Sequence, residues 1–247
     1  MSKKSIVCAL FLLLFSVMPV LAEEGFRNPS YTKQEIDEQE NMLYRVEKVF
    51  PKFLLWETFD VATKPTVEKS DSGFYYSEIN TRAGKYEITV AAVNTARNEF
   101  NLGDSHFRIT GSYTDFYVSI EAQLIEWDDS QKGYIFFQYT NREIVGEKNS
   151  STVELLYPQE VRKCVNNASG RNCTTYYDLS AYKNDYNVHK FEFFRSNGYA
   201  RFFIDGNYIA GFKDGIDGRC TSLYGSGLLP GGKYVTGSFD EFKFRAK

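Results

Sequence analysis

Apolar and polar residues alternate along much of this chain, most regularly between Asp115 and Trp127. A β-strand points successive side chains to opposite faces, so a period of two separates a buried face from a solvated one. This segment is therefore predicted to be a long strand of a large, curved sheet. Its core face is predicted to carry Phe116, Val118, Ile120, Ala122 and Leu124.

The C-terminal part of the chain shows the same alternation, interrupted by tight turns. Asn197-Gly198 and Asp205-Gly206 separate three aromatic-rich runs, and both central residues of such turns need positive φ. A closing run from Gly237 to Phe244 alternates again. These hairpins predict antiparallel β structure. Further strands are predicted at residues 53–60, 74–80, 85–93, 106–111 and 133–141, with weaker candidates at 151–157 and 174–178.

The order of these elements predicts an all-β fold. Many short strands with turns between them, and no βαβ rhythm, are typical of a sandwich or a barrel. Aromatic residues make up 17% of the chain, which suits wide sheets whose interior needs bulky side chains. One β domain is predicted over residues 53–247, because β-sandwiches often reach this size undivided.

One amphipathic helix is predicted near residues 33–50, before the β region. Thr32 and Glu35 have the spacing of a capping box, in which each side chain accepts a hydrogen bond from the other residue's backbone. Apolar residues follow at helical spacing, and Pro51 ends the pattern. Residues 23–52 thus form a linker and a helix. The helix either covers one end of the sandwich, joins a second copy or another partner, or is a partly disordered spacer.

The first 22 residues are predicted to be a secretory signal. Lys3 and Lys4 precede an apolar run from Ile6 to Val20, and Ala22 offers a small residue for cleavage. The run is shorter than the roughly 20 residues that span a bilayer, so a membrane anchor is not expected after cleavage. The mature protein is expected to be secreted, periplasmic or on the cell surface.

The charge of the chain argues against nucleic acid as a partner. It has 29 basic and 32 acidic side chains, and removing Lys3 and Lys4 leaves 27 basic ones, a net charge of about −5. A nucleic-acid binder needs a basic surface that this composition does not supply.

Three cysteines remain beyond the signal: Cys164, Cys173 and Cys220. The residues between Cys164 and Cys173 are turn-forming throughout, which favours a disulfide between these two in an oxidising compartment. The alternative joins Cys220 to one of them. A zinc site is not expected, because the chain has two histidines and no Cys-x-x-Cys motif.

The order of the motifs resembles the concanavalin-A-like lectin/glucanase superfamily, in particular laminin-G-like and 3-keto-disaccharide hydrolase domains. The motifs are Leu55-Trp-Glu-Thr-Phe-Asp60, the alternating strand from Asp115, Gly133-Tyr-Ile-Phe-Phe, the Phe-Phe-Ile-Asp-Gly hairpin and the closing strand from Gly237. The resemblance covers roughly residues 53–245. It implies a jelly-roll sandwich of two curved antiparallel sheets, often with a glycan on the concave face, and does not by itself imply catalysis.

Six residues are candidates for holding a glycan on one concave surface. Aromatic faces pack against the C–H groups of sugars, and planar polar side chains bind their hydroxyls. The alternative is a hydrated outer face without a ligand. The candidates are Tyr117, Glu121, Gln123, Phe136, Gln138 and Arg142.

The same strand contains a weak catalytic candidate. Laminarinase-type members of the superfamily carry Glu-x-Asp-x-x-Glu, and Glu121 and Glu126 have that spacing, with Gln123 in place of the aspartate. In the family pattern a bulge brings the second glutamate onto the face of the first. Strict alternation would instead put Glu121 and Glu126 on opposite faces, and a retaining pair needs both carboxyls on one side of the substrate.

A structural calcium is implied by the resemblance only, which would point to Asp60 and Asp240. The Lys213–Gly218 segment also places Asp214 and Asp217 in a glycine-containing loop, which suits either a hard cation or simple turn chemistry. No cofactor is certain.

These observations predict a secreted, non-catalytic protein that binds a glycan or a glycoprotein. The alternatives are a divergent glycoside hydrolase or polysaccharide lyase of the same fold, and a structural or adhesive surface protein.

Overall fold

The computed structural model describes residues 32–43, 45–51, 53–59, 67–69, 75–82, 84–92, 103–108, 112–141 and 149–247. The predicted signal at 1–22 lies outside these residues, and the predicted domain boundary at residue 53 stays a prediction. No helix in the described part of the chain is long and apolar enough to cross a bilayer.

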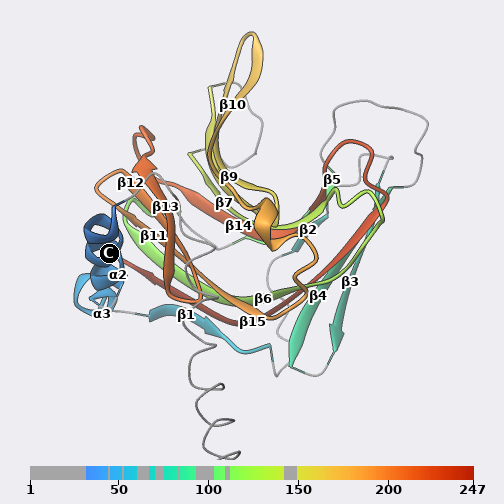
Figure 1. The fold of residues 1–247 in the computed structure, drawn as a ribbon, viewed down its shortest axis with the longest axis horizontal. Helices are drawn as coiled ribbons and strands as arrows, with labels where there is room; N and C mark the ends of the chain where they lie inside the picture. The colour runs from blue at the N-terminus through green and yellow to red at the C-terminus, as the bar shows by residue number, and fades with distance from the viewer. Residues whose placement is uncertain are drawn as a thin grey trace, which may run out of the picture.

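The described chain folds into two antiparallel sheets that pack face to face (Figure 1). Sheet A runs β13-β12-β11-β6-β15-β4-β3, with β1 also paired to β15, and sheet B runs β10-β9-β8-β7-β14-β5-β2. Sheet A contains β1 (Phe53–Glu57), β3 (Tyr75–Arg82), β4 (Lys85–Ala92), β6 (Phe116–Trp127), β11 (His189–Ser196), β12 (Tyr199–Ile204), β13 (Asn207–Lys213) and β15 (Tyr234–Ala246). Sheet B contains β2 (Val67–Lys69), β5 (Gly103–Arg108), β7 (Gly133–Thr140), β8 (Ser151–Tyr157), β9 (Glu160–Asn167), β10 (Gly170–Asp178) and β14 (Thr221–Leu228).

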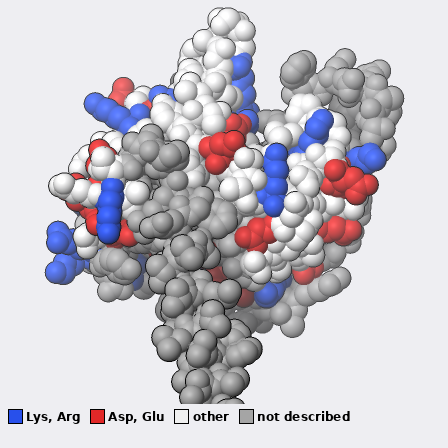
Figure 2. Space-filling model, in the orientation of Figure 1, with Lys and Arg blue, Asp and Glu red and all other residues white. Residues whose placement is uncertain are grey.

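The two sheets bend in the same sense, and sheet A curves around sheet B (Figure 1). The outer face of sheet B therefore lies on the inner side of the bend. The β9–β10 hairpin extends from this side and projects beyond its neighbours (Figures 1 and 2). The predicted all-β jelly-roll sandwich of two curved antiparallel sheets is confirmed.

The core lies between the sheets and follows the predicted alternation. All five residues predicted for the core face of β6 are buried in the main hydrophobic cluster. Sheet B contributes Ile135, Phe137 and Tyr139 from β7 to the same cluster. Burying an aliphatic or phenyl side chain of this size contributes about 1.5–3 kcal/mol relative to leaving it exposed, so these strands supply much of the folding energy.

The predicted hairpin turns join β11 to β12 and β12 to β13. Asn197 and Gly198 have φ of 53° and 69°, and Asp205 and Gly206 have φ of 52° and 79°. Positive φ at both central residues is the requirement that Asn-Gly and Asp-Gly meet at low cost. The closing strand β15 then lies between β6 and β4, so the end of the chain is at the centre of sheet A.

The predicted N-terminal helix forms two pieces, α2 (Lys33–Leu43) and α3 (Val46–Val49). Its capping box is present: the Glu35 amide donates to Thr32 Oγ1 over 3.3 Å, and the Thr32 amide donates to Glu35 Oε2 over 2.8 Å. These hydrogen bonds lower the pKa of Glu35 below its usual value.

Both helical pieces pack on the outer face of sheet A, at left in Figure 1. Arg201 Nε donates to Gln39 Oε1 over 2.7 Å, and Arg245 Nη1 donates to the Phe50 carbonyl over 3.1 Å. The apolar face of the helix is thus used within this chain, and joining a second copy through it stays a prediction. The cluster formed there contains Ile36, Leu43, Val46, Phe50, Tyr117, Phe194, Phe203 and Tyr208.

Cys164 and Cys173 form the predicted disulfide, and Cys220 is a buried free thiol. The two half-cystines are direct partners on β9 and β10. The residues between them were expected to be turn-like throughout, which is wrong, because most of them belong to the two paired strands. Closing so short a loop contributes about 2–3 kcal/mol in the chain-entropy account. Burial raises the pKa of the Cys220 thiol to about 12.

His189 links two loops at one end of the sandwich through both ring nitrogens. Nδ1 lies 2.6 Å from Asp205 Oδ2, and Nε2 lies 3.1 Å from Asp185 Oδ2. Burial opposes protonation of the ring, but the hydrogen bond and charge of Asp205, together with Asp185, outweigh it. The pKa of His189 is therefore raised above 6.5. The imidazolium form, in which both nitrogens donate, fits this arrangement.

We expect this contact to make stability depend on pH in one direction. Because the pKa of His189 is higher in the folded state, its contribution is fully present below the unfolded value of 6.5 and is lost as pH rises through the raised value. Urea unfolding between about pH 5 and 9 measures this slope. His189→Gln should remove this loss. An identical slope in the variant would show that other groups cause it.

Candidate functional site

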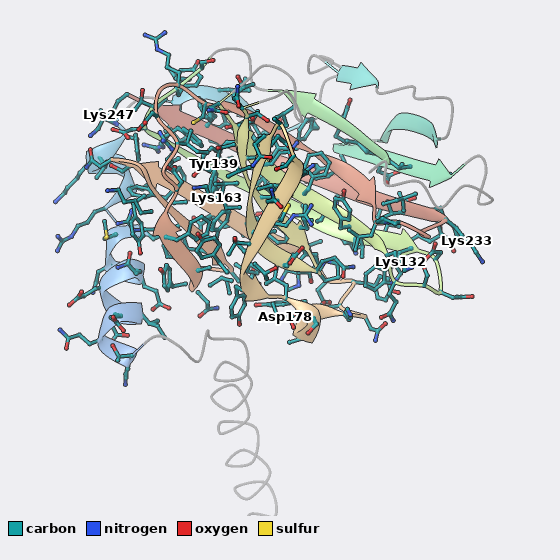
Figure 3. The ribbon with its side chains drawn as sticks, turned by 90° about the horizontal axis from the view of Figure 1, so that it is seen from above. Lys132, Tyr139, Lys163, Asp178, Lys233 and Lys247 are labelled. Carbon is teal, nitrogen blue, oxygen red and sulfur yellow. A yellow bond between two sulfur atoms is a disulfide. The ribbon has the colours of Figure 1, made fainter. Side chains whose placement is uncertain are left out.

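The outer face of sheet B gathers a continuous set of side chains on the inner side of the bend. Since Ile135, Phe137 and Tyr139 point into the core, the alternate residues of β7 point outward. The register then sets Gln138 opposite Glu154 on β8, and Glu154 opposite Arg162 on β9. Figure 3 looks down on this side, with the β9–β10 hairpin toward the viewer.

One half of this face is apolar. Tyr134 and Phe136 from β7 pack with Leu156 from β8 and Leu223 from β14 in a hydrophobic cluster separate from the core. The Tyr134 ring lies against Gly227, where a β-carbon would come within 2.7 Å of the ring. Glycine at this position therefore lets an aromatic ring lie close to the sheet.

The other half is charged and tightly hydrogen-bonded. Arg162 Nε donates to Glu154 Oε2 over 2.6 Å, and Arg162 Nη1 donates to Glu160 Oε1 over 2.9 Å. Arg171 Nη2 donates to the second oxygen, Glu154 Oε1. Burial of Arg162 would lower the pKa of its guanidinium, but Glu154 and Glu160 raise it above the usual value. Glu154, only 2% exposed, thus lies between two arginines.

Three polar atoms beside this ion pair have no hydrogen-bond partner among the described residues. They are Gln138 Nε2, Thr152 Oγ1 and Arg171 Nε, each buried. Thr152 is two residues before Glu154 on β8, and Gln138 on β7 is the direct partner of Glu154. A buried polar group without a partner costs about 1–3 kcal/mol, so a site of this kind favours water or a ligand rich in polar groups.

The six predicted binding residues do not share one surface. Phe136 and Gln138 lie on the outer face of sheet B, whereas Tyr117, Glu121 and Gln123 lie on the outer face of sheet A. The prediction of one common surface is therefore wrong. Alternation shows which residues of a strand point outward, but it does not show that β6 and β7 belong to different sheets, whose outer faces lie on opposite sides of the sandwich. Arg142 lies outside the described residues.

Two of the sheet A candidates are already engaged. Tyr117 is buried under the helix and donates a 2.5 Å hydrogen bond to Glu192 Oε1. Gln123 Nε2 donates to the Tyr186 carbonyl over 2.6 Å. The first contact joins β6 to β11 and the second holds the 183–188 loop against the sheet, so neither side chain is free to bind a ligand.

Glu121 and Glu126 lie on the same face, contrary to strict alternation. The pairing of β15 with β6 shifts between Thr236, opposite Glu126, and Gly237, opposite Leu124. Ile125 is therefore an extra residue, which is the definition of a β-bulge. The bulge turns Glu126 toward the outer face of sheet A, where Glu121 also lies.

The calcium prediction stays untested. Asp60 lies outside the described residues, and Asp240 Oδ1 accepts a hydrogen bond from the Glu241 amide over 2.8 Å. Asp214, the other cation candidate, pairs with Arg195 over 2.6 Å. In the part of the chain that the structure describes, no three His, Cys, Asp or Glu side chains are grouped closely enough to hold a metal ion.

Sequence reasoning missed the charged half of the sheet B face. Thr152, Glu154 and Leu156 alternate with Val153, Leu155 and Tyr157, so the sequence does carry a strand pattern here, but the run is short and predicts a strand only weakly. Arg171 lies between the two cysteines, where turn-forming residues hide the strand, and Arg162 lies just before Cys164, in a stretch for which the sequence predicts no strand.

Comparison with solved structures finds the same sandwich in proteins of very different sequence. A glycoside hydrolase family 16 endo-glucanase from Bacteroides ovatus matches at 10% identity and TM-score 0.56, over 77% of this chain and 99% of that one. The κ-carrageenase from Pseudoalteromonas carrageenovora matches at 10% identity and TM-score 0.53, over 77% and 92%. A Bacillus subtilis protein of galectin-like fold matches at 11% identity and TM-score 0.53, over 80% and 97%.

These likenesses confirm the fold that the resemblance implies, a sandwich of two curved antiparallel sheets. No protein-family model matches the chain, and no curated protein matches it by sequence. At such low identity the shared fold carries no residue-by-residue assignment of function.

Proposed function

We propose that this protein is exported and binds carbohydrate or glycoconjugates, without cleaving them, through the outer face of sheet B. The observation that carries the proposal is the pairing of two aromatic side chains, Tyr134 and Phe136, with polar atoms that lack partners. All of them are buried in this structure, Tyr134 being 3% and Phe136 2% exposed, so a ligand reaches them only where this face opens. A sugar ring presents C–H groups on one side and hydroxyls around its edge, so it matches both halves of such a face.

The hydrogen-bonding inventory agrees with a polyhydroxylated ligand. The Gln138 amide offers both donors and an acceptor, and the Thr152 hydroxyl donates and accepts. A sugar hydroxyl also does both, so it can satisfy either group. The fold gives further support by analogy, since the similar structures include glycan-degrading enzymes, one of them in complex with a carrageenan oligosaccharide.

Two glutamines on opposite faces give a matched test. Gln138→Ala is expected to weaken binding of the best ligand from a glycan array by about five- to tenfold, the loss of one hydrogen bond at a desolvated site. Gln123→Ala, the same change on the outer face of sheet A, should leave affinity unchanged. Isothermal titration calorimetry measures both. If Gln123→Ala alone weakens binding, the ligand lies on sheet A and this proposal fails.

A divergent hydrolase is the second candidate, because the Ile125 bulge puts Glu121 and Glu126 on one face as the laminarinase-type motif requires. Against it, Gln123 replaces the central aspartate, and the face is the outer side of the bend. Release of reducing ends from polysaccharides by the wild type, abolished in Glu121→Gln, would establish this alternative.

A further inference from the structure

The short strand β1 exposes four consecutive apolar side chains. Their exposed fractions lie between 42% and 57%, in Phe53, Leu54, Leu55 and Trp56. Among the other described residues, no two large apolar side chains adjacent in sequence are both exposed. Single exposed apolar residues are ordinary on a protein surface, whereas a contiguous patch marks an interaction site.

The strand also has an open edge. Among the described strands β1 pairs only with β15, beside the second half of that strand (Figure 1). An open edge presents a row of backbone N–H and C=O groups that can pair with another chain, and soluble proteins often place charged residues there to prevent this. No charged residue occurs between Phe53 and Trp56. The edge is therefore suited to pairing with a further strand.

The register of β1 shows which face each side chain uses. The rings of Phe53 and Trp56 stack with centroids 5.6 Å apart, so they share one face. Leu55 lies opposite the core residue Phe244 and points to the other face. The register shifts at Leu54, which has no partner on β15. The aromatic pair is thus on the outer face of sheet A.

The order of residues along β1 is complementary to itself. From residue 52 to residue 57 the chain reads basic, aromatic, leucine, leucine, aromatic, acidic. If this strand pairs antiparallel with a copy of itself about a two-fold axis, every position meets a matching one. Unlike charges, aromatic rings and apolar side chains are all favourable cross-strand neighbours. The pairs between the two copies are Lys52 with Glu57, Phe53 with Trp56, and Leu54 with Leu55.

We infer that β1 is the interface of a symmetric dimer, in which its open edge pairs with β1 of a second copy and joins the two A sheets. A second copy is the occupant because the complementarity, including that of charge, is of the strand with itself. The stacked rings of Phe53 and Trp56 from both copies then lie together on the outer face. The strand is short, so the dimer is weak and depends on protein concentration.

Sedimentation velocity of the exported protein over a range of concentrations measures this equilibrium. We expect a monomer and a dimer in the wild type. Leu54→Lys should weaken dimerisation by about tenfold or more, because a central contact is lost on both copies. Val188→Lys is the control: Val188 is also 48% exposed, but it lies in the 183–188 loop, so the equilibrium should not change. Thermal melting confirms that each variant is folded.

A charge exchange tests the two-fold register. Lys52→Glu and Glu57→Lys each place like charges at both ends of the paired strands, so each should weaken the dimer by about tenfold. When the two variants are mixed, both ends again carry opposite charges, and a dimer with one copy of each should form.

A wild type that stays monomeric at every concentration, or a dimer unaffected by Leu54→Lys, would overturn the inference. A dimer lost in Leu54→Lys but not restored by mixing the charge variants would overturn the two-fold pairing. Neither result bears on the proposed function, because glycan binding by the outer face of sheet B does not require β1.

Discussion

Asp214→Ala is expected to lower the free energy of unfolding by about 3–5 kcal/mol, the cost of removing one partner from a buried ion pair. Asp214 is 0% exposed and Arg195 is 1% exposed. Arg195 Nε donates to Asp214 Oδ2 over 2.6 Å, and the Tyr139 hydroxyl donates to the same oxygen over 2.6 Å. Without the carboxylate, a guanidinium would remain buried without its counter-charge.

The network around this pair explains why the protein cannot readily adjust. Arg195 Nη2 also donates to the Ile216 carbonyl over 2.8 Å, and Nη1 donates to the Thr114 carbonyl. Burial would lower the pKa of Arg195, but Asp214 and the other neighbours raise it above its usual value, so the group stays charged. Three separate segments of the chain therefore meet at one cation.

Asp217 supplies the matched control, three residues further along the same loop and exposed. Asp217→Ala should change stability by less than about 0.5 kcal/mol. Asp214→Asn, which keeps the shape but loses the charge, should still be strongly destabilising. Urea unfolding of the three variants measures these differences. Equal losses for Asp214→Ala and Asp217→Ala would show that the pair contributes little to stability.

The fold was predictable because its signals are local. The alternation of β6 and the Asn-Gly and Asp-Gly turns each depend on neighbouring residues, and tertiary structure reinforced them. By contrast, β14 was not predicted, since Gly225 and Gly227 weaken its strand pattern. Similarly, β9 was hidden because Asn166, Asn167, Ser169 and Gly170 are turn formers, although only the tip of that hairpin is a turn.

The site was less predictable because it depends on which strands become neighbours. Alternation placed Gln123 and Gln138 on outward faces, but could not show that β6 and β7 lie in opposite sheets. The Ile125 bulge is likewise invisible in the sequence, since it arises from the register of β15, about a hundred residues away. The Arg195–Asp214 pair joins two segments that only the packed sandwich brings together.

Phe137→Ala is the core substitution with the largest expected effect outside the ion pair. The Phe137 ring stacks on Phe191 with centroids 4.7 Å apart, and it lies 5.6 Å from Tyr224 and 6.5 Å from Phe239. Since Phe137 comes from sheet B, whereas Phe191 and Phe239 come from sheet A, this ring joins the two layers. Its removal leaves a cavity and is expected to cost about 3–5 kcal/mol.

Phe53→Ala provides the comparison. The Phe53 ring on β1 is 44% exposed, so its removal leaves no cavity inside the protein. Its loss should be within about 1 kcal/mol, mainly from stacking on Trp56 and the contact with Arg245. Phe137→Leu should fall between the two, since it retains part of the buried volume. Denaturant unfolding ranks the three variants. If Phe137→Ala were no worse than Phe53→Ala, this ring would not be what holds the two sheets together.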